Sequence, residues 1–474
     1  MPLLPSGDLL AGPAPHPPGV AAAAVRRILL VSYHFPPSEA AGALRWQRLT
    51  PLAARLGWEV DAITLAPDLA DSIGWERVAE LPPSTQIHGV DKPEPLIGRL
   101  ELAARRAWRT LHPAETVGGA PKRPTSFHRT EVGWLSGGPR ALLRALNVLL
   151  SYARENAWAR AAVESGLEIA VRHPHDLVIS CGPPHLVHVA GRRLAQALKV
   201  PFVMDLRDPW SLQTRLHEEV ASPLWFRLAD WEEARCVAQA DLIVMNTPLA
   251  AAEMQAKWPR SRVMAVMNGW DEEPLPSSPW PDQFRVVYAG SIYIDRTPQP
   301  FFRAVAGAVR HLGIGPEEFQ VRLIGTVEAF GGQSVAGLAA AEGIGEYLRV
   351  IPTMPRRETL REYSQAAVLL SLPQDSHLAI PSKVFEYLRQ PCWVIAQTTP
   401  DSATGEVLRG TSAFVVSPDD VERTQEILVR CFEEFQAGRR PEPIAREGRF
   451  SRAAEGAKLF TALESLVGNG PGSS

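Results

Sequence analysis

The feature that most constrains this chain is an alternation of short apolar runs with segments of helical spacing. In the first half, Leu44, Leu49, Leu52 and Leu56 recur at helical spacing between two such runs, and Gly57 ends the segment. Short apolar runs separated by helices are typical of strands buried on both faces of an open parallel sheet. The runs of the first half are residues 28–32, 59–64, 176–180, 201–205, 241–245 and 262–266.

The alternation stops near the middle of the chain and then begins again. Residues 268–283 are rich in Pro, Glu, Ser and Trp, which is typical of an inter-domain linker. The second set of runs comprises residues 284–290, 320–325, 347–351, 368–371, 393–396 and 413–416. We therefore predict an α/β protein with two Rossmann-like, doubly wound domains that face each other across a cleft.

The predicted boundaries follow this pattern. A Pro- and Ala-rich leader and a Gly- and Ser-rich tail are expected to be disordered and to lie outside the fold. In chain order, the predicted segments are a leader at 1–25, a first domain at 26–271 with an insertion at about 66–160, a linker at 272–283, a second domain at 284–445, a C-terminal helical segment at 446–467 and a tail at 468–474.

Composition excludes several classes of function. The 49 basic and 52 acidic residues give a formal charge of −3, so no net positive field favours nucleic acid as a partner. The four cysteines are far apart and form no CxxC pair, which argues against a disulfide framework or a thiolate zinc site. No apolar stretch reaches the roughly 18 residues that a membrane-spanning helix needs. We expect a cytoplasmic protein.

In open parallel sheets, ligands bind beyond the carboxyl ends of strands, so unusual residues that follow strands are candidates for the site. In the first domain, Gly42 precedes a helix, where a small residue would let backbone N–H groups approach an anionic oxygen. The alternative is an ordinary loop glycine. His185, after the run at 176–180, suits contact with a substrate oxygen or acid–base work. The alternative is a solvated loop histidine.

Asp205, Arg207 and Asp208 follow the run at 201–205 and are close to Trp210. Charges at the end of a buried strand are costly unless they are paired or used. The two readings are a ligand or catalytic site, and an Arg–Asp pair that holds a loop together.

In the second domain, Gly290 and Ser291 follow the first run, and Arg296 supplies a fixed cation that suits a phosphate. Gly325 follows the next run. These positions would lie together if both runs are neighbouring parallel strands, because the carboxyl ends of such strands share one edge of the sheet.

Residues 380–388 predict a helix that Pro381 enters at its first turn. Ser382, Lys383 and the free N–H groups there would suit a diphosphate, and Glu386 could accept hydrogen bonds from the vicinal hydroxyls of a sugar. The alternative is a surface helix with an ordinary Lys and Glu three residues apart.

Six segments, in order, resemble the motifs of a glycosyltransferase of the GT-B fold, in the retaining group usually called family 4. The resemblance covers about residues 27–466, without the insertion and the two ends. The segments are YHFPPSEAAGALRW, DLVISCGPPHLVHVAG, VPFVMDLRDPW, VMNGWDEE, VVYAGSIYIDR and IPSKVFEYL.

This resemblance implies a nucleotide-diphosphate sugar as donor substrate, held mainly by the second domain, and an acceptor hydroxyl on a glycan or lipid-linked sugar. Glu386 would bind the ribose of the donor, and Gly42 would face the diphosphate from across the cleft. The residues about the diphosphate would be Gly290, Ser291, Arg296, Gly325, Ser382 and Lys383. The candidate catalytic residues, on the acceptor side where the transferred sugar sits, would be His185, Asp205, Arg207 and Asp208.

No metal and no cofactor are predicted, because no Asp-any-Asp pair follows a strand with a suitable partner. Helix N-termini, Arg296 and Lys383 would then offset the charge of the leaving group. A front-face transfer assisted by the donor's own phosphate needs no protein nucleophile. The expected role is polysaccharide or glycoconjugate biosynthesis.

Leu378 departs from the family pattern, which often has a second Glu at this position, near the sugar ring. Leu378 therefore leaves open a non-catalytic subunit that binds nucleotide sugar. A separate alternative is a sugar-nucleotide epimerase or hydrolase of the same fold, which nucleotide release without acceptor would favour. A dinucleotide-dependent dehydrogenase is disfavoured, because neither first strand leads into a GxGxxG turn.

The amphipathic stretch at residues 140–154 combines Leu and Arg. We expect it to pack on its own domain. The alternative is peripheral contact with the inner membrane face, where the stretch would bring in a lipid-linked acceptor.

Overall fold

The computed structural model describes residues 25–111, 126–132, 138–276, 279–292, 296–374, 377–446 and 448–468. The predicted leader, apart from Val25, and the predicted tail, apart from Gly468, lie outside the described residues.

The first domain is built on a parallel sheet of seven strands in the order β3-β2-β1-β5-β6-β8-β9. Six of these strands coincide with the predicted runs. The strands are β1 Arg26–Ser32, β2 Trp58–Leu65, β3 Gln86–Val90, β5 Leu177–Gly182, β6 Phe202–Leu206, β8 Leu242–Met245 and β9 Val263–Ala265. The edge strand β3 lies in the range assigned to the insertion, so this part of the range belongs to the sheet.

Helices cover both faces of this sheet, and neighbouring residues of each strand face opposite sides. In β1, Ile28 and Leu30 face a core made with helix α1, whereas Leu29 and Val31 face a core made with α4, α5, α6 and α7. The helices are α1 Leu44–Arg55, α4 Gly138–Arg172, α5 Val187–Leu198, α6 Pro223–Val237 and α7 Pro248–Lys257.

The helix predicted from the spacing of four leucines is α1, and two of them, Leu49 and Leu52, are buried. Leu44 and Leu56 are 38% and 42% exposed, while Arg45 and Trp46 are buried. Arg45 and Trp46 both bond to a buried carboxylate of the sheet, a tertiary contact that the spacing of the leucines does not show.

The second domain is a parallel sheet of six strands in the order β14-β11-β10-β15-β16-β17, and all six correspond to predicted runs. The strands are β10 Phe284–Ala289, β11 Phe319–Ile324, β14 Leu348–Ile351, β15 Val368–Ser371, β16 Trp393–Gln397 and β17 Phe414–Val416. Its helices are α8 Gln299–Leu312, α9 Val335–Ala341, α10 Arg356–Ser364, α11 Ser382–Tyr387, α12 Ala403–Leu408 and α13 Val421–Gln436. The predicted fold class is confirmed.

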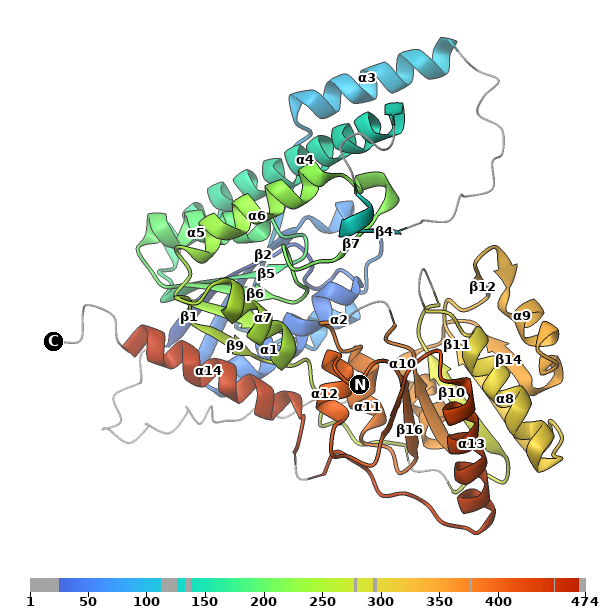
Figure 1. Cartoon of the computed structure of the whole chain (residues 1–474). Coiled ribbons are helices and arrows are strands. Elements are labelled where there is room, and N and C mark those ends of the chain that lie inside the picture. Colours follow the sequence, from blue (N-terminus) through green and yellow to red (C-terminus); the bar gives the residue numbers. More distant parts are fainter. Residues whose placement is uncertain are drawn as a thin grey trace, which may run out of the picture.

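The last helix, α14 (Arg452–Gly468), returns from the second domain to the first and lies along it (Figure 1). Leu459, Phe460 and Leu463 are buried in the core on the α1 side of the first sheet. A side chain at Gly456 would collide with Leu52 of α1, so the glycine allows the two helices to pack closely. The C-terminal segment therefore completes the core of the first domain.

Smaller elements lie beside the first sheet. They are the helices α2 Glu76–Ala79 and α3 Leu96–Leu111 and the antiparallel strands β4 Ser126–His128 and β7 Arg215–His217. Figure 1 shows α3 and the first half of α4 projecting together beyond the sheet. No helix of the described residues, the 35-residue α4 included, has both the length and the apolar character that crossing a bilayer needs.

The stretch at 140–154 forms part of α4 and is only partly covered by its own domain. Val148 and Leu150 are buried, whereas Leu142 and Leu143 are 74% and 58% exposed. The exposed leucines lie on the half of α4 that projects from the sheet (Figure 1).

Candidate functional site

Two predicted residues of the first domain, Gly42 and Arg207, meet at the carboxyl end of the sheet. Gly42 lies in the short 3-10 turn before α1, and a Cβ there would collide with the guanidinium of Arg207. Arg207 Nη2 donates a hydrogen bond of 2.8 Å to Pro183 O, which ties the loop after β6 to the loop after β5. A cation therefore lies against the loop where an anionic oxygen was predicted.

Asp205 is buried and its carboxylate is already bonded. Arg45 Nε lies 3.0 and 2.8 Å from its two oxygens, and Trp46 Nε1 donates to Oδ2 at 2.9 Å. Arg45 also donates to Val266 O at 3.0 Å. This is an Arg–Asp pair that holds the structure together, with Arg45 in place of Arg207 as the partner. Asp208, in contrast, is exposed and lies 3.9 Å from Arg207 Nε.

His185 is 9% exposed, so the alternative of a solvated loop histidine is wrong. Its ring stacks on Trp210 with centroids 5.2 Å apart and planes within 12°. Burial, together with the nearby His188 and Arg207, lowers the pKa of His185 well below its ordinary value of 6.5. The imidazole is therefore neutral at physiological pH and can donate or accept a hydrogen bond but carries no charge.

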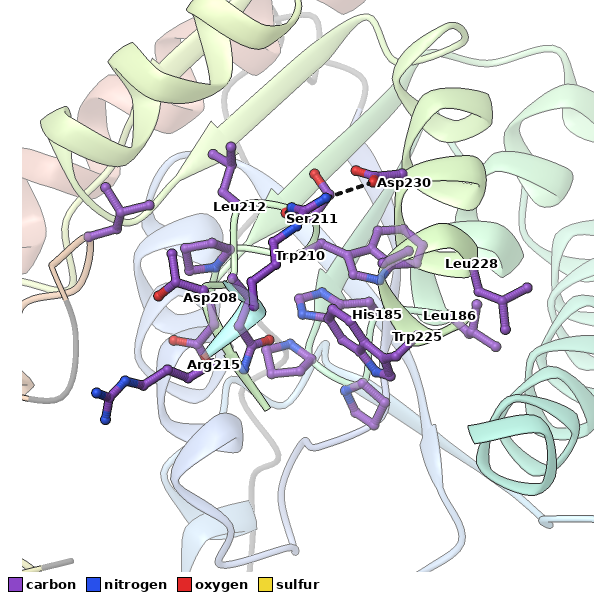
Figure 2. Close-up of a pocket in the computed structure, with 18 of the residues that line it drawn as sticks. His185, Leu186, Asp208, Trp210, Ser211, Leu212, Arg215, Trp225, Leu228 and Asp230 are labelled. Atoms are coloured by element: carbon purple, nitrogen blue, oxygen red, sulfur yellow. Dashed lines mark hydrogen bonds and ion pairs between the residues drawn. The ribbon is translucent and has the colours of Figure 1, made fainter. Parts of the chain in front are cut away.

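A cavity of about 1280 Å³ opens beside His185. Most of its wall belongs to the first domain, but His377, Leu378 and Ala379 of the second domain also line it, and we call it the inter-domain cavity. Figure 2 shows His185, Trp210 and Trp225 gathered at its centre, with Asp208 and Arg215 toward one side. The remaining lining residues are Arg129, Val148, Ser151, Tyr152, Glu155, Pro183, Pro184, Leu186, Pro209, Ser211, Leu212, Gln213, Thr214, Leu228, Ala229, Asp230, Glu253 and Lys257.

One side of this cavity is supported by a charge network. Lys257 Nζ lies 2.9 Å from Asp230 Oδ1 and 3.2 Å from the buried Glu233 Oε1, and it also contacts Ser211 Oγ. Glu233 accepts a further hydrogen bond of 3.0 Å from Ser211 N. These paired charges fix the loop after β6 against α6 and α7, and they are structural.

In the second domain, the predicted Gly290, Gly325 and Lys383 come together. Gly290 and Gly325 follow β10 and β11 and have φ of +148° and +118°, a region that favours glycine. A side chain at Gly290 would collide with Lys383 Nζ, and one at Gly325 would collide with Gly290 O. The Lys383 ammonium donates to Ala289 O and lies 4.2 Å from the ring centroid of Tyr288. The two strand ends and the start of α11 thus form one cationic corner.

Ser291 and Ser382 adjoin this corner in the chain, next to Gly290 and Lys383. Ser291 O accepts a hydrogen bond of 2.8 Å from Tyr288 Oη, and Ser382 is exposed at the first position of α11. Arg296 is half-buried shortly before α8. Pro381 precedes α11 as its N-cap and is not a residue of its first turn, so the helix begins at Ser382, two residues later than predicted.

Glu386 belongs to an acidic and basic network that spans the two domains. Arg356 of α10 donates to Glu386 Oε1 and, at 3.0 Å, to Glu273 Oε1. Arg356 lies 3.8 Å from Asp271, whose carboxylate is in turn 3.6 Å from Arg48 of α1. Glu386 therefore faces the junction between the domains.

The predicted residues thus form three groups: Gly42 with Arg207, the corner at Lys383, and Glu386 with Arg356. His185 and Asp208 line the inter-domain cavity, as does Leu378, the position that departs from the family pattern. Leu378 O accepts a hydrogen bond of 2.7 Å from Thr247 Oγ1, the N-cap of α7, so this loop of the second domain is held against the first.

Sequence reasoning missed Arg45, Arg356, Tyr152 and Glu155. Arg45 and Arg356 lie on helices far along the chain from Asp205 and Glu386, and no spacing signals these pairs. Tyr152 falls in the stretch at 140–154 that was interpreted only as amphipathic, and Glu155 directly follows it. In the residues that the structure describes, no cluster of three or more His, Cys, Asp or Glu side chains could hold a metal ion.

No protein-family model and no curated protein sequence matches the chain. Solved structures do. A sucrose-phosphate synthase from Thermosynechococcus elongatus has a TM-score of 0.57 at 14% identity, over 94% of this chain and 99% of that one. A glycosyltransferase from Rickettsia africae has a TM-score of 0.55 at 11% identity, over 94% of this chain and 100% of that one. A protein described as a UDP-N-acetylglucosamine 2-epimerase from Listeria monocytogenes has a TM-score of 0.52 at 10% identity, over 93% of this chain and 96% of that one.

The chain has the GT-B fold. At these identities the likeness establishes the arrangement of the two domains, and reactions differ among the three proteins.

Proposed function

We propose that the protein is a glycosyltransferase that moves a hexosyl group from a nucleotide-diphosphate sugar to a hydroxyl of a glycan or lipid-linked sugar. The observation that carries this proposal is the cationic corner at Lys383. It combines two glycines at the ends of neighbouring strands with an ammonium group, at the edge of the sheet where parallel α/β proteins bind ligands. The GT-B fold and its glycosyltransferase neighbours support the same reaction.

On the donor side, Lys383 and Arg296 would attract the diphosphate, with Ser291 and Ser382 as hydrogen-bond donors beside it. The glycines Gly290 and Gly325 would let backbone N–H groups approach the phosphate oxygens. Glu386 would accept hydrogen bonds from the ribose hydroxyls, and Arg356 would hold its carboxylate in place through Oε1. Arg207, against Gly42, would approach the diphosphate from the first domain.

The transfer itself would proceed with retention and without a metal or cofactor. The acceptor oxygen bonds to the anomeric carbon as the bond to the phosphate oxygen breaks, and the departing phosphate takes the acceptor proton. Lys383, Arg296 and Arg207 would stabilise the negative charge that develops on the diphosphate. The neutral His185 would orient a sugar hydroxyl beside Trp210.

The acceptor would enter through the inter-domain cavity. The exposed Leu142 and Leu143 of α4, which adjoin Arg140 and Arg144, suit a lipid-linked acceptor that is presented at a membrane surface. We therefore place the protein in the cytoplasm, with peripheral contact at the inner membrane face, in polysaccharide or glycoconjugate biosynthesis.

The test is a panel of nucleotide sugars. We expect one of them to raise the melting temperature of the full chain, and nucleotide release to increase when cell-extracted lipids or soluble glycans are added. Glu386→Ala should weaken donor binding by about 10-fold or more, because hydrogen bonds to a charged group contribute roughly 1.5–3 kcal/mol.

Glu362→Ala is the matched control, because Glu362 is also paired with an arginine of the second domain, 2.8 Å from Arg322 Nε, and is not one of the predicted site residues. An equal response of wild type and Glu386→Ala to every donor would contradict the ribose assignment.

The neighbour described as an epimerase supports one competing function. A sugar-nucleotide epimerase or hydrolase would convert or cleave the donor at the same rate with and without any acceptor. Acceptor-independent turnover as the only activity would therefore replace our proposal with this alternative.

A further inference from the structure

One face of α4 lines the inter-domain cavity, and this face was not assigned by any motif. Val148, Ser151, Tyr152 and Glu155 line the cavity at spacings of three, four and seven residues, which is one side of a helix. One turn further, Trp158 is 1% exposed and lies in the core of the first domain. Glu155 therefore stands at the inner end of the cavity, where the core begins.

The carboxylate of Glu155 has no hydrogen bond or ion pair with any residue in the described part of the chain. Lys92 is the cation that acts on it electrostatically, but burial has the larger effect and raises the pKa of Glu155 to about 7. A half-buried carboxylate without a bonded partner destabilises a fold. Such a cost is typical of a group that serves binding or catalysis.

Aromatic rings surround the same space. Tyr152 Oη donates a hydrogen bond of 2.5 Å to Glu232, so its hydroxyl is occupied and its ring forms part of the wall. Trp210 and Trp225 form another part (Figure 2). Sugar rings pack their C–H faces on aromatic rings and donate hydroxyl hydrogen bonds to carboxylates. The volume of about 1280 Å³ exceeds that of most small-molecule pockets, so more than one sugar unit fits.

We propose that Glu155 binds the hydroxyl groups of a saccharide acceptor in the inter-domain cavity and determines which acceptor is used. The proposal rests on the proposed glycosyl transfer and adds the acceptor-side residue. A saccharide here would touch both domains, because His377 and Leu378 close the cavity from the second domain.

The test compares Glu155→Gln with wild type. The acceptor probes are the methyl glycosides of glucose, galactose and mannose and of their disaccharides, each with the donor found in the nucleotide-sugar panel. We expect the acceptor KM to rise about 10- to 100-fold in Glu155→Gln, because a hydrogen bond to a charged group is lost. The donor KM and the slow release of nucleotide into water should not change.

Glu168→Gln is the control, since Glu168 is an exposed acid further along α4, away from the cavity. It should behave like wild type in every measurement. Glu155→Asp keeps the charge on a shorter side chain and should fall between wild type and Glu155→Gln.

A second readout separates binding from a structural role. Because the folded-state pKa of Glu155 is raised, its ionisation destabilises the fold above pH 7, and this cost declines as the pH falls toward 4.5. Glu155→Gln should therefore raise the melting temperature by a few degrees at pH 8 and by less at pH 5. A structural carboxylate would give a lower melting temperature.

A failure of the role assigned to Glu155 can be distinguished from a failure of the proposed transferase function. If the donor is turned over but the acceptor KM of Glu155→Gln equals that of wild type, the role of Glu155 is wrong and the transferase proposal stands. If no nucleotide sugar is turned over, saccharide binding measured by tryptophan fluorescence still tests Glu155. Wild type that binds none of these saccharides would overturn the assignment of the cavity to sugar hydroxyls.

Discussion

The two domains use charged residues at the ends of their strands in opposite ways. In the second domain, Lys383 beside Gly290 and Glu386 beside Arg356 remain partly accessible. In the first domain, Asp205 is 1% exposed and bonded to Arg45 and Trp46. The same kind of motif therefore leaves accessible charges, which we propose to be ligand-binding groups, in one domain and forms a buried pair in the other. Burial and partners, more than residue type, decide which role a charge takes.

The largest expected effect tests Asp205 as scaffold. Arg45→Met would leave the Asp205 carboxylate buried without its cation, and such a change typically costs 3–5 kcal/mol of folding free energy, so we expect a loss of about this size. Urea unfolding followed by tryptophan fluorescence measures it. The double variant Arg45→Met with Asp205→Leu should recover part of the loss, because it removes both charges. An unchanged unfolding midpoint in Arg45→Met would mean that Asp205 is not scaffold and is available for chemistry.

The opposite behaviour is expected in the second domain. Lys383→Met should weaken the binding of the nucleotide-sugar donor about 100-fold, because it removes the ammonium beside Gly290, while the free energy of unfolding should change by less than about 1 kcal/mol. Calorimetric titration with the donor and urea unfolding measure the two quantities. Lys458→Met is the control, since Lys458 is an exposed residue of α14 paired with Glu455. If Lys383→Met lost much folding stability but still bound the donor, Lys383 would act as scaffold, as we expect of Asp205. The contrast between the two domains would then fail.

The sequence predicted most of the sheets and the positions of the residues in the cationic corner, because both depend on local pattern. Twelve apolar runs correspond to strands, and Gly290, Gly325 and Lys383 follow or begin elements as expected. Strand β3 was missed because its sequence, QIHGV, has no continuous apolar run. The spacing of leucines located α1 but did not show that Arg45 is buried, because its pairing with Asp205 is a tertiary contact.

The acceptor side was far less predictable. Its wall combines α4, the loop after β6 and residues 377–379, segments that are far apart in the chain. Glu155 lies inside a helix among alanines and arginines, and nothing in its neighbours shows that its face borders a cavity. Only the packing of α4 against the first sheet places it there. The cationic corner is thus encoded in short segments, whereas the inter-domain cavity, where we propose that the acceptor binds, arises from tertiary structure.

The smallest expected effect is a pH dependence that sharpens this difference. Burial raises the pKa of Glu155 to about 7, against the opposing effect of Lys92, so the fraction of ionised carboxylate should rise about 10-fold between pH 6 and 8. Because the ionised form accepts hydrogen bonds from sugar hydroxyls, acceptor kcat/KM should rise by up to this factor, while donor affinity should change less. The measurement is initial rate against acceptor concentration across this range.

Other charged groups face the same cavity, so the comparison with Glu155→Gln decides the assignment. They are Arg129, Asp208, Arg215, Asp230, Glu253, Lys257 and His377. The buried His185 is neutral throughout this range, because its pKa lies well below 6.5. The part of the pH dependence that belongs to Glu155 should disappear in Glu155→Gln, whereas any part that belongs to another group of the cavity should persist. An equally steep pH profile in Glu155→Gln would show that the acceptor kcat/KM does not depend on the Glu155 carboxylate. The charged contact that we assign to the acceptor would then be wrong.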